Sequence, residues 1–231
     1  MSKPSEQEII EKGELVVEGR FVDASNATLF AHAVLGDLKV PVIYKPVAGE
    51  RPLWDFPDGN LASREVAAYK FSQALGLGLV PFTIMREGPF GIGSVQQWIE
   101  IDEELDVVAY VAQSPHALRK MALFDAIINN TDRKFGHILI DLHGQIYGCD
   151  HGVCFHSDDK LRTVLWNWSG QTLTESEIEI LRHASRSTDV VAELLTAHEL
   201  AALNQRIASL LENEIFPEPS DQWPSVPFPP Y

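Results

Sequence analysis

Short apolar runs separated by turn residues fill the first hundred residues, a pattern typical of β-strands. The turns include "DASN" and "GDL", whose small polar residues and glycine favour tight reversals. One helix is predicted at 61–76, with Ser63 as its N-cap and Gly76 as its stop. Its apolar face includes Val66 and Tyr69. The predicted strands are 14–22, 27–35, 39–46, 79–88 and 90–101.

Helical periodicity replaces this pattern from residue 103 onward. Ser114 is expected to cap one helix, with Pro115 at the first helical position. Thr174 and Glu177 predict a capping box at the start of another. The predicted helices are 103–113, 114–130, 173–184 and 196–215. We therefore expect an α+β fold with a β-rich N-terminal lobe, residues 1–101, and a mainly helical C-terminal lobe, residues 102–231.

The last fifteen residues and a nearby tryptophan pair lie outside these regular patterns. Six prolines in "PEPSDQWPSVPFPPY" exclude a helix or a central strand, so we expect this segment to pack along the surface of its own lobe. Trp166 and Trp168 are expected to pack against the helical lobe, with a stacking platform for a substrate ring as the alternative.

The stretch "NNTDRKFGHILIDLHGQIYGCDHGVCFH", residues 129–156, concentrates aspartates, histidines and both cysteines. It contains a predicted hairpin, "HILID" and "IYGCD" joined by "LHGQ". If the hairpin is centred on His143, His137 lies opposite Cys149 and beside Asp150, facing the loop that holds Asp132. The spacing therefore predicts a metal-binding corner.

Charge and cysteine content narrow the classes of partner. The 231 residues carry a formal net charge of −15, which argues against nucleic acid as a main partner and disfavours constitutive docking on anionic lipid. The first residues lack the apolar core of a secretory signal, and no apolar run is long enough for a membrane helix. Two cysteines are too few for a disulfide framework, so we expect a cytoplasmic protein without membrane insertion.

Four residues occur in the chain order that kinase-type phosphoryl transfer requires. Lys45 ends an apolar strand, and Glu65 follows twenty residues later on the predicted helix. Asp132 follows a long apolar helix, and Asp150 lies two residues before Gly152. Taken alone, Lys45 is typical of a solvated strand end, Glu65 of a first-turn acid and Asp132 of a helix-ending loop. Their combined order favours a kinase site.

The motifs "NNTDRKFGHILID" and "IYGCDHG" resemble the catalytic and metal-binding loops of the phosphatidylinositol 3- and 4-kinase-like superfamily. The resemblance is strongest to type II phosphatidylinositol 4-kinases and related bacterial proteins. "IYKP" and "REVAAYKFSQALGLGLVP" resemble the strand end and the helix of the same family, so the similarity spans roughly residues 13–156. It implies a protein-kinase-like fold and an ATP-dependent kinase using Mg²⁺.

The resemblance also implies a role for each residue. Lys45 would contact the α- and β-phosphates of ATP and Glu65 would hold it, while Asp132 would be the catalytic aspartate and Asp150 would bind the metal. The inter-lobe hinge that contacts adenine would be Gln97, Trp98 and Ile99. The phosphate-covering loop lacks a Gly-x-Gly pattern, so Ser25 and Asn26 would supply its donors.

His137 departs from the family pattern, because an asparagine usually occupies the position five residues after the catalytic aspartate. Imidazole matches Mg²⁺ poorly and Mn²⁺ better, so Mn²⁺ is an alternative metal. Asn129 and Asn130 are alternative oxygen ligands.

Three other functions stay open. A zinc site could draw on the histidines and cysteines, but no pair has structural-zinc spacing. The fold could serve as a nucleotide-binding pseudokinase, or as a protein kinase like the HipA toxins, which are longer and have a different catalytic loop. The acceptor would be a hydroxyl of a small molecule, a lipid headgroup or a protein, and the acidity favours a soluble metabolite or a protein.

Overall fold

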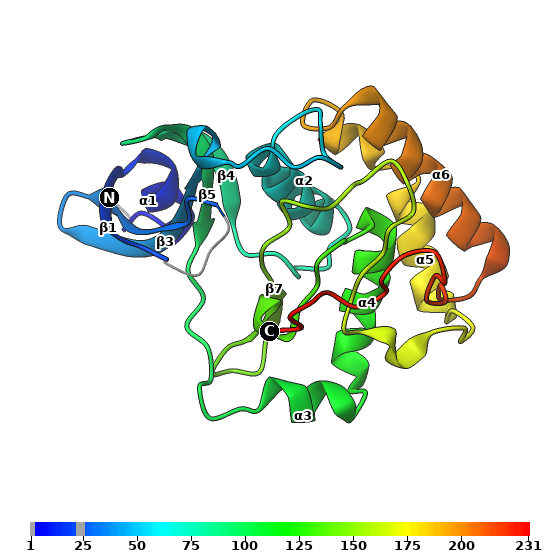
Figure 1. The fold of residues 1–231 in the computed structure, drawn as a ribbon. Coiled ribbons are helices and arrows are strands. Elements are labelled where there is room, and N and C mark those ends of the chain that lie inside the picture. Colours follow the sequence, from blue (N-terminus) through cyan, green and yellow to red (C-terminus); the bar gives the residue numbers. More distant parts are fainter. Residues whose placement is uncertain (1–2, 22–25) are drawn as a thin grey trace.

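The computed structural model describes residues 3–21 and 26–231. A five-stranded antiparallel sheet forms the N-terminal part, and helices form most of the remainder, with α2 between them (Figure 1). The predicted α+β fold is confirmed. The N-terminal elements are α1 (Glu6–Lys12), β1 (Glu14–Arg20), β2 (Leu29–Leu35), β3 (Leu38–Pro46), α2 (Leu61–Ala74), β4 (Thr83–Gly88) and β5 (Gly91–Gln97). The later elements are α3 (Val107–Ala112), α4 (His116–Ile128), β6 (Ile138–Ile140), β7 (Ile146–Gly148), α5 (Glu175–Ala184) and α6 (Ala197–Asn213).

The strand order in the sheet is β1-β2-β3-β5-β4, and β3 pairs with both β2 and β5. Val40, Val42 and Tyr44 of β3 are buried against α1 and β4, whereas the alternate residues are more exposed. This period of two places Lys45 on the face opposite Tyr44. Helix α1 was not predicted; it is short and buries Ile9 and Ile10 against the sheet.

Helix α2 joins the sheet to the helical core. Ala67 and Phe71 are buried in the same apolar cluster as α4. Its N-cap is Asn60, whose side chain accepts the Ser63 N–H at 2.7 Å, so the expectation of Ser63 as N-cap is wrong. Asn60 has the extended backbone of a cap, whereas Ser63 is already helical. The expected stop is confirmed, since Gly76 has φ +66°.

Two further predicted boundaries differ. Helix α4 begins at His116 with Pro115 as N-cap, because Ser114 has φ 53° and its hydroxyl accepts a hydrogen bond from Asn167. Strand β4 begins at Thr83, since Pro81 has no N–H to donate to a sheet. By contrast, the Thr174–Glu177 capping box is present on α5.

The hairpin of β6 and β7 has the predicted register. Ile138 pairs with Gly148, which centres the hairpin on His143. The Cys149 N–H donates to the carbonyl of His137 at 3.1 Å. The spacing argument therefore placed His137 and Asp150 at one end of the hairpin correctly.

The proline-rich segment, residues 217–231, packs on its own helical lobe as expected. The carbonyl of Ser225 accepts hydrogen bonds from the Thr163 N–H at 3.0 Å and from Trp166 Nε1 at 2.8 Å. Trp168 is buried in the helical core, in agreement with the packing interpretation of the tryptophan pair. No helix in the described part of the chain is long and apolar enough to cross a membrane.

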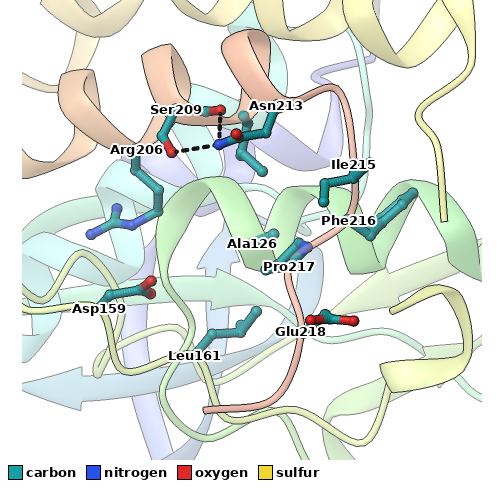
Figure 2. A pocket seen from close by; sticks show the side chains of 11 residues that line it. Ala126, Asp159, Leu161, Arg206, Ser209, Asn213, Ile215, Phe216, Pro217 and Glu218 are labelled. Atoms are coloured by element: carbon teal, nitrogen blue, oxygen red, sulfur yellow. Dashed lines mark hydrogen bonds between the residues drawn. The ribbon is translucent and has the colours of Figure 1, made fainter. Parts of the chain in front are cut away.

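A cavity of about 220 Å³ lies between α4, α6 and the start of the proline-rich segment (Figure 2). Arg206 lines it and donates to the carbonyls of Ile127 and His156 at 3.1 and 2.9 Å. Asn213 lines it as well, and its amide donates to Ser209. These polar groups serve the internal packing of the helices.

Candidate active site

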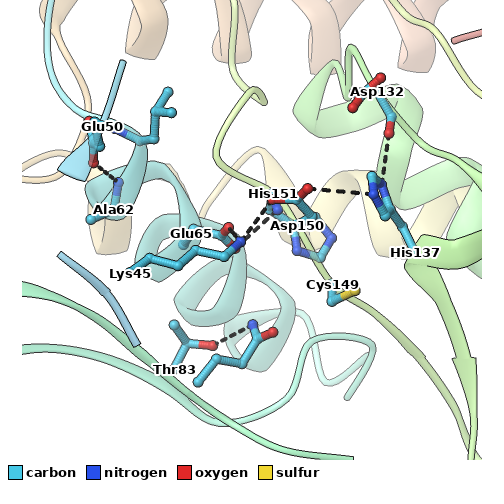
Figure 3. Close-up of polar contacts among 12 residues, drawn as sticks. Lys45, Glu50, Ala62, Glu65, Thr83, Asp132, His137, Cys149, Asp150 and His151 are labelled. Carbon is cyan, nitrogen blue, oxygen red and sulfur yellow. Dashed lines mark hydrogen bonds and ion pairs between the residues drawn. The ribbon is translucent and has the colours of Figure 1, made fainter. Parts of the chain in front are cut away.

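Lys45 lies near the end of the central strand β3 and contacts two distant parts of the chain. Its ammonium group donates to Glu65 of α2 and to Asp150 Oδ1, which lies 2.8 Å away just after β7 (Figure 3). Glu65 is buried, and its second carboxylate oxygen accepts the His151 N–H at 3.0 Å. Three residues that are 20 and 105 positions apart in sequence therefore form one charged cluster.

Electrostatics hold this cluster in its ionised form. Burial disfavours the charge of Lys45, but Asp150 and Glu65 outweigh burial and raise the pKa of Lys45 above its ordinary value. The charge of Lys45 is the largest influence on Asp150 and holds the pKa of that carboxyl well below its ordinary value. The Asp150 side chain is still 50% exposed, so one carboxylate oxygen stays accessible.

Asp150 has an unusual backbone conformation for a residue with a side chain, with φ 58°. The next glycine, Gly152, lies close to α2, because a Cβ there would be 3.1 Å from the Leu61 side chain. The tight turn directs the carboxylate toward Lys45 and His137.

His137 lies between the two aspartates. Its Nδ1 is 2.9 Å from the backbone carbonyl oxygen of Asp132, and its Nε2 is 3.4 Å from Asp150 Oδ2. Burial lowers the pKa of the imidazole below its ordinary value, although Asp150 opposes the shift. A neutral imidazole with Nδ1 protonated leaves the Nε2 lone pair facing Asp150.

Lys134 is a site residue that the sequence analysis missed. Its ammonium group lies 3.4 Å from Asp132 Oδ2. Burial raises the pKa of Asp132 above its ordinary value, and Lys134 opposes this shift. A lysine two residues after the candidate catalytic aspartate was the available signal.

The sequence analysis also missed Arg133, a buried residue whose side chain makes hydrogen bonds to several segments around the site. Its guanidinium makes two hydrogen bonds to Asp125 of α4, at 2.9 and 2.8 Å, and both side chains are fully buried. It also donates to the carbonyls of His137 and Cys149 at 3.0 and 3.1 Å. Arg133 therefore connects the loop of residues 129–137, called here the Asp132 loop, to α4 and to the segment after β7 that contains Asp150.

The two asparagines at the start of this loop have structural roles. Asn130 donates to Asp125 and accepts the Asp132 N–H, both at 3.0 Å. Asn129 ends α4 in the left-handed conformation, and its amide donates to the carbonyls of His156 and Asp158. Both are fully buried, so the alternative that they supply metal ligands in place of His137 finds no support.

The cysteines and the remaining histidines do not form a metal cluster. Within residues 3–21 and 26–231, no three His, Cys, Asp or Glu side chains gather in a metal-binding arrangement. Burial raises the pKa of the Cys149 thiol to about 12 and that of Cys154 well above its ordinary value. His151 is buried, and its Nε2 accepts from Arg133 at 2.8 Å.

The three expected hinge residues lie at the end of β5, where Gln97 is its last residue, and two of their amides already donate to the backbone of neighbouring segments. The Gln97 N–H donates to Phe82 at 2.8 Å, and the Trp98 N–H donates to Pro41 at 3.1 Å. The amide of Ile99 has no backbone partner among the described residues. Only one of the three amides thus stays available for a ligand.

The expected phosphate-covering loop is partly described. Ser25 lies outside the described residues. Asn26 Oδ1 accepts the Arg51 N–H at 2.8 Å, and the Ala27 N–H donates to Gly49 at 3.1 Å. Asn26 therefore attaches the end of this loop to the segment that follows β3.

Solved structures with a similar fold include kinases. Hydra Fam20 with sugar has a TM-score of 0.59 at 14% identity, covering 92% of this chain and 90% of that chain. The Helicobacter pylori proinflammatory kinase CtkA has a TM-score of 0.51 at 12% identity, with coverages of 89% and 94%. The Golgi casein kinase with Mn/ADP bound has a TM-score of 0.56 at 12% identity, with coverages of 90% and 76%. The chain therefore has a kinase-like fold.

A closer relationship appears at the level of sequence. Protein Rv2133c of Mycobacterium tuberculosis (strain ATCC 25618 / H37Rv) is 38% identical over 267 residues, covering 98% of this chain and 96% of the relative. The chain belongs to the family of Protein Rv2133c. No protein-family model matches the sequence.

Proposed function

We propose that this protein is an ATP-dependent phosphotransferase that transfers the γ-phosphoryl group to a hydroxyl acceptor. The observation that carries the proposal is the contact of Lys45 with both Glu65 and Asp150. A kinase needs a lysine for the phosphates, an acid on a neighbouring helix and a metal-binding aspartate. In this proposal Lys45, Glu65 and Asp150 fill these three roles in that order. In this proposal residues 1–101 and 102–231 work together as one kinase-like domain.

Each side chain has a defined task. Lys45, held by Glu65, binds the phosphates of ATP. Asp132 accepts a hydrogen bond from the acceptor hydroxyl and orients it for in-line attack on the γ-phosphorus. Lys134, next to Asp132, places positive charge where the transferred group accumulates negative charge.

Asp150 and His137 fit a divalent cation. The Nε2 lone pair of His137 and Oδ2 of Asp150 face each other at 3.4 Å, and two such acceptors repel unless a cation or a proton lies between them. A bound Mg²⁺ or Mn²⁺ would neutralise charge on the phosphates of ATP. The imidazole favours Mn²⁺, and the Golgi casein kinase with Mn/ADP bound offers a precedent within this fold.

The adenine would lie against the segment after β5, near Gln97, Trp98 and Ile99. Ile99 supplies the free amide, and Trp98 supplies an aromatic ring that packs edge-on against Phe30 at 5.4 Å. Asn26 and Ser25 would act at the phosphates. The carbonyl oxygen of the Asn26 side chain already accepts from Arg51, so its NH2 group would be the donor to the phosphates.

Within kinases, the motifs of the Asp132 loop favour the phosphatidylinositol 3- and 4-kinase-like superfamily, with type II phosphatidylinositol 4-kinases as the most similar branch. A lipid headgroup is therefore one possible acceptor, with a small molecule or a protein as the others. The net charge of −15 disfavours an anionic membrane surface and supports a soluble metabolite or a protein as acceptor.

Calorimetric titration of ATP into the protein tests the site, with Mg²⁺, with Mn²⁺ and with neither. We expect metal-dependent binding that is lost in Asp150→Ala. Asp132→Asn should keep ATP binding and abolish phosphate release from ATP, the turnover in which water takes the place of the hydroxyl acceptor. Asp37→Asn, in the exposed turn between β2 and β3, should change neither. Absence of ATP binding under all three conditions would overturn the proposal.

A nucleotide-binding module without transfer is a second candidate, favoured by His137 in place of an oxygen ligand. It predicts that ATP binds but that phosphate release is equally low in the unmodified protein and in Asp132→Asn. The same pair of measurements therefore separates the two functions.

A further inference from the structure

The proline-rich segment ends on the Asp132 loop. The Phe135 N–H donates to the carbonyl of Pro230 at 2.8 Å. The ring of Phe135 packs against the ring of Tyr231, with centroids 5.6 Å apart. In Figure 1 the segment runs from the helices across the lobe to a point beside β7. Phe135 thus has a partner from the far end of the sequence.

Phe135 lies within the part of the loop that the proposed reaction depends on. Asp132 precedes it by three residues and His137 follows it by two. Because His137 Nδ1 contacts the Asp132 carbonyl, a displacement of Phe135 would move both residues. The end of the segment also lies beside the adjacent Gly136, where a Cβ would be 3.9 Å from the carbonyl carbon of Tyr231.

A second set of contacts couples the same segment to the other side of the loop. The Arg133 N–H donates to Arg162, and the Val164 N–H donates to Arg133, at 3.0 and 3.1 Å. Thr163, between them, donates in turn to Ser225 at 3.0 Å. The Asp132 loop, residues 162–164 and the proline-rich segment therefore lie side by side.

Aromatic contacts fix the middle of the segment. The ring of Trp223 lies 4.6 Å from the ammonium group of Lys160 and 5.9 Å from the guanidinium of Arg162. The end of the segment, by contrast, contributes little to the apolar core, since Phe228 is 91% exposed and Tyr231 is 69% exposed. The last contacts serve the loop more than they serve global stability.

We propose that residues 223–231 are a positioning segment, which holds the Asp132 loop in the geometry for phosphoryl transfer through the Pro230–Phe135 hydrogen bond and the Tyr231–Phe135 ring contact. This inference rests on the proposed function for its kinetic consequence. Its structural part, restraint of Phe135, can be measured without turnover.

Hydrogen exchange tests the structural part, on the otherwise intact chain with residues 229–231 deleted. The Phe135 amide should exchange about tenfold faster, the effect of losing one hydrogen bond, while amides of α4 stay protected. Phe90→Ala is the matched control, because it removes a 55% exposed ring that lies outside this segment, in the turn between β4 and β5, and should change nothing. Unchanged exchange at Phe135 in the deletion variant would overturn the inference.

Phosphate release from ATP in the presence of Mn²⁺ tests the kinetic part. The deletion should lower kcat about tenfold or more with the Kd of ATP kept within about twofold, because misplacement of reacting groups affects the transition state. Tyr231→Ala, which keeps the Pro230 carbonyl, should fall between the deletion and the unmodified protein, and it gives the decisive comparison if the deletion variant folds poorly. An unchanged or increased kcat would overturn the positioning role.

The two proposals fail in different ways. If the unmodified protein binds ATP but transfers its γ-phosphoryl group to no acceptor, water included, the transferase proposal fails, and the exchange rate at Phe135 alone decides whether the segment restrains the loop. If the unmodified protein is active and the deletion is equally active, the transferase proposal stands and the positioning segment does not.

Discussion

His137 Nδ1 lies 2.9 Å from the backbone carbonyl oxygen of Asp132, so a hydrogen bond joins the two residues of the Asp132 loop that have proposed functions. A carbonyl can only accept, and the imidazole must therefore carry its proton on Nδ1. The hydrogen bond fixes both the ring orientation and the tautomer, which is how protein metal sites commonly hold a histidine ligand. One contact thereby links the proposed metal position to the proposed catalytic aspartate.

Replacement of His137 by asparagine should change the metal preference. The unmodified protein should bind ATP more tightly with Mn²⁺ than with Mg²⁺, because imidazole is a poor ligand for Mg²⁺. His137→Asn offers an oxygen and should shift the ratio of the two affinities toward Mg²⁺ by roughly tenfold. Calorimetric titrations with each metal give the ratio. His143→Asn, at the exposed tip of the hairpin, is the control, and equal ratios in all three proteins would exclude His137 as a ligand.

Loss of the buried Arg133–Asp125 pair should strongly destabilise the fold. Both side chains are fully buried, so Arg133→Gln leaves the carboxylate of Asp125 without its charge partner. The free energy of unfolding should fall by about 3–5 kcal/mol, measured by chemical denaturation. Arg182→Gln removes an arginine that pairs with Glu179 at the surface and should have no measurable effect. Equal stabilities of the two variants would contradict the role of Arg133.

Acid should destabilise the protein through buried His151. Burial holds the pKa of His151 well below the ordinary value of 6.5, and Arg133 adds to the shift. Below that pH the unfolded chain binds a proton that the folded chain does not, so the free energy of unfolding falls as the pH decreases. The slope is about 1.4 kcal/mol per pH unit for one such group.

His151→Gln isolates this contribution, because the amide oxygen can still accept from Arg133 while the side chain no longer titrates. Denaturation between about pH 5 and 7.5 should show a smaller slope in the variant. His137 also has a lowered pKa and contributes to both proteins equally, so the difference belongs to His151. Identical slopes would show that His151 does not titrate in this range.

The sequence was sufficient to predict the positions of site residues where their spacing within one segment determines the geometry. The symmetry of the hairpin about His143 placed His137 opposite Cys149, and the observed pairing of Ile138 with Gly148 has that register. Chain order alone suggested Glu65 as the partner of Lys45, and their contact is present.

Other features depend on contacts between distant segments. An arginine in a polar loop is ordinarily exposed, so nothing local indicated that Arg133 is buried against α4. The amides of Gln97 and Trp98 donate to the backbone of neighbouring segments, which a motif comparison cannot foresee. The N-cap of α2 was misplaced because Asn60 and Ser63 are both good capping residues, and the backbone of the preceding loop decides between them.

Lys134 should lower the pKa of Asp132. Burial raises the pKa of Asp132 above its ordinary value of 3.8, and the nearby ammonium group of Lys134 opposes that rise. Since Asp132 must be ionised to accept from the acceptor hydroxyl, phosphate release should fall at acidic pH with a midpoint above 3.8. Lys134→Ala removes the opposing charge, so the pKa of Asp132 rises and the midpoint should move to higher pH.

The plateau rate distinguishes this effect from a change in nucleotide binding. Above the midpoint, Lys134→Ala should still lose about tenfold to a hundredfold in kcat, because charge next to the transferring phosphoryl group is gone. The Kd of ATP should change much less, since Lys45 binds the other phosphates. Lys134→Arg should restore the midpoint, and Lys39→Ala, a surface lysine paired with Glu18, should match the unmodified protein throughout. A midpoint that stays in place or moves to lower pH in Lys134→Ala would show that the ammonium group does not act on Asp132.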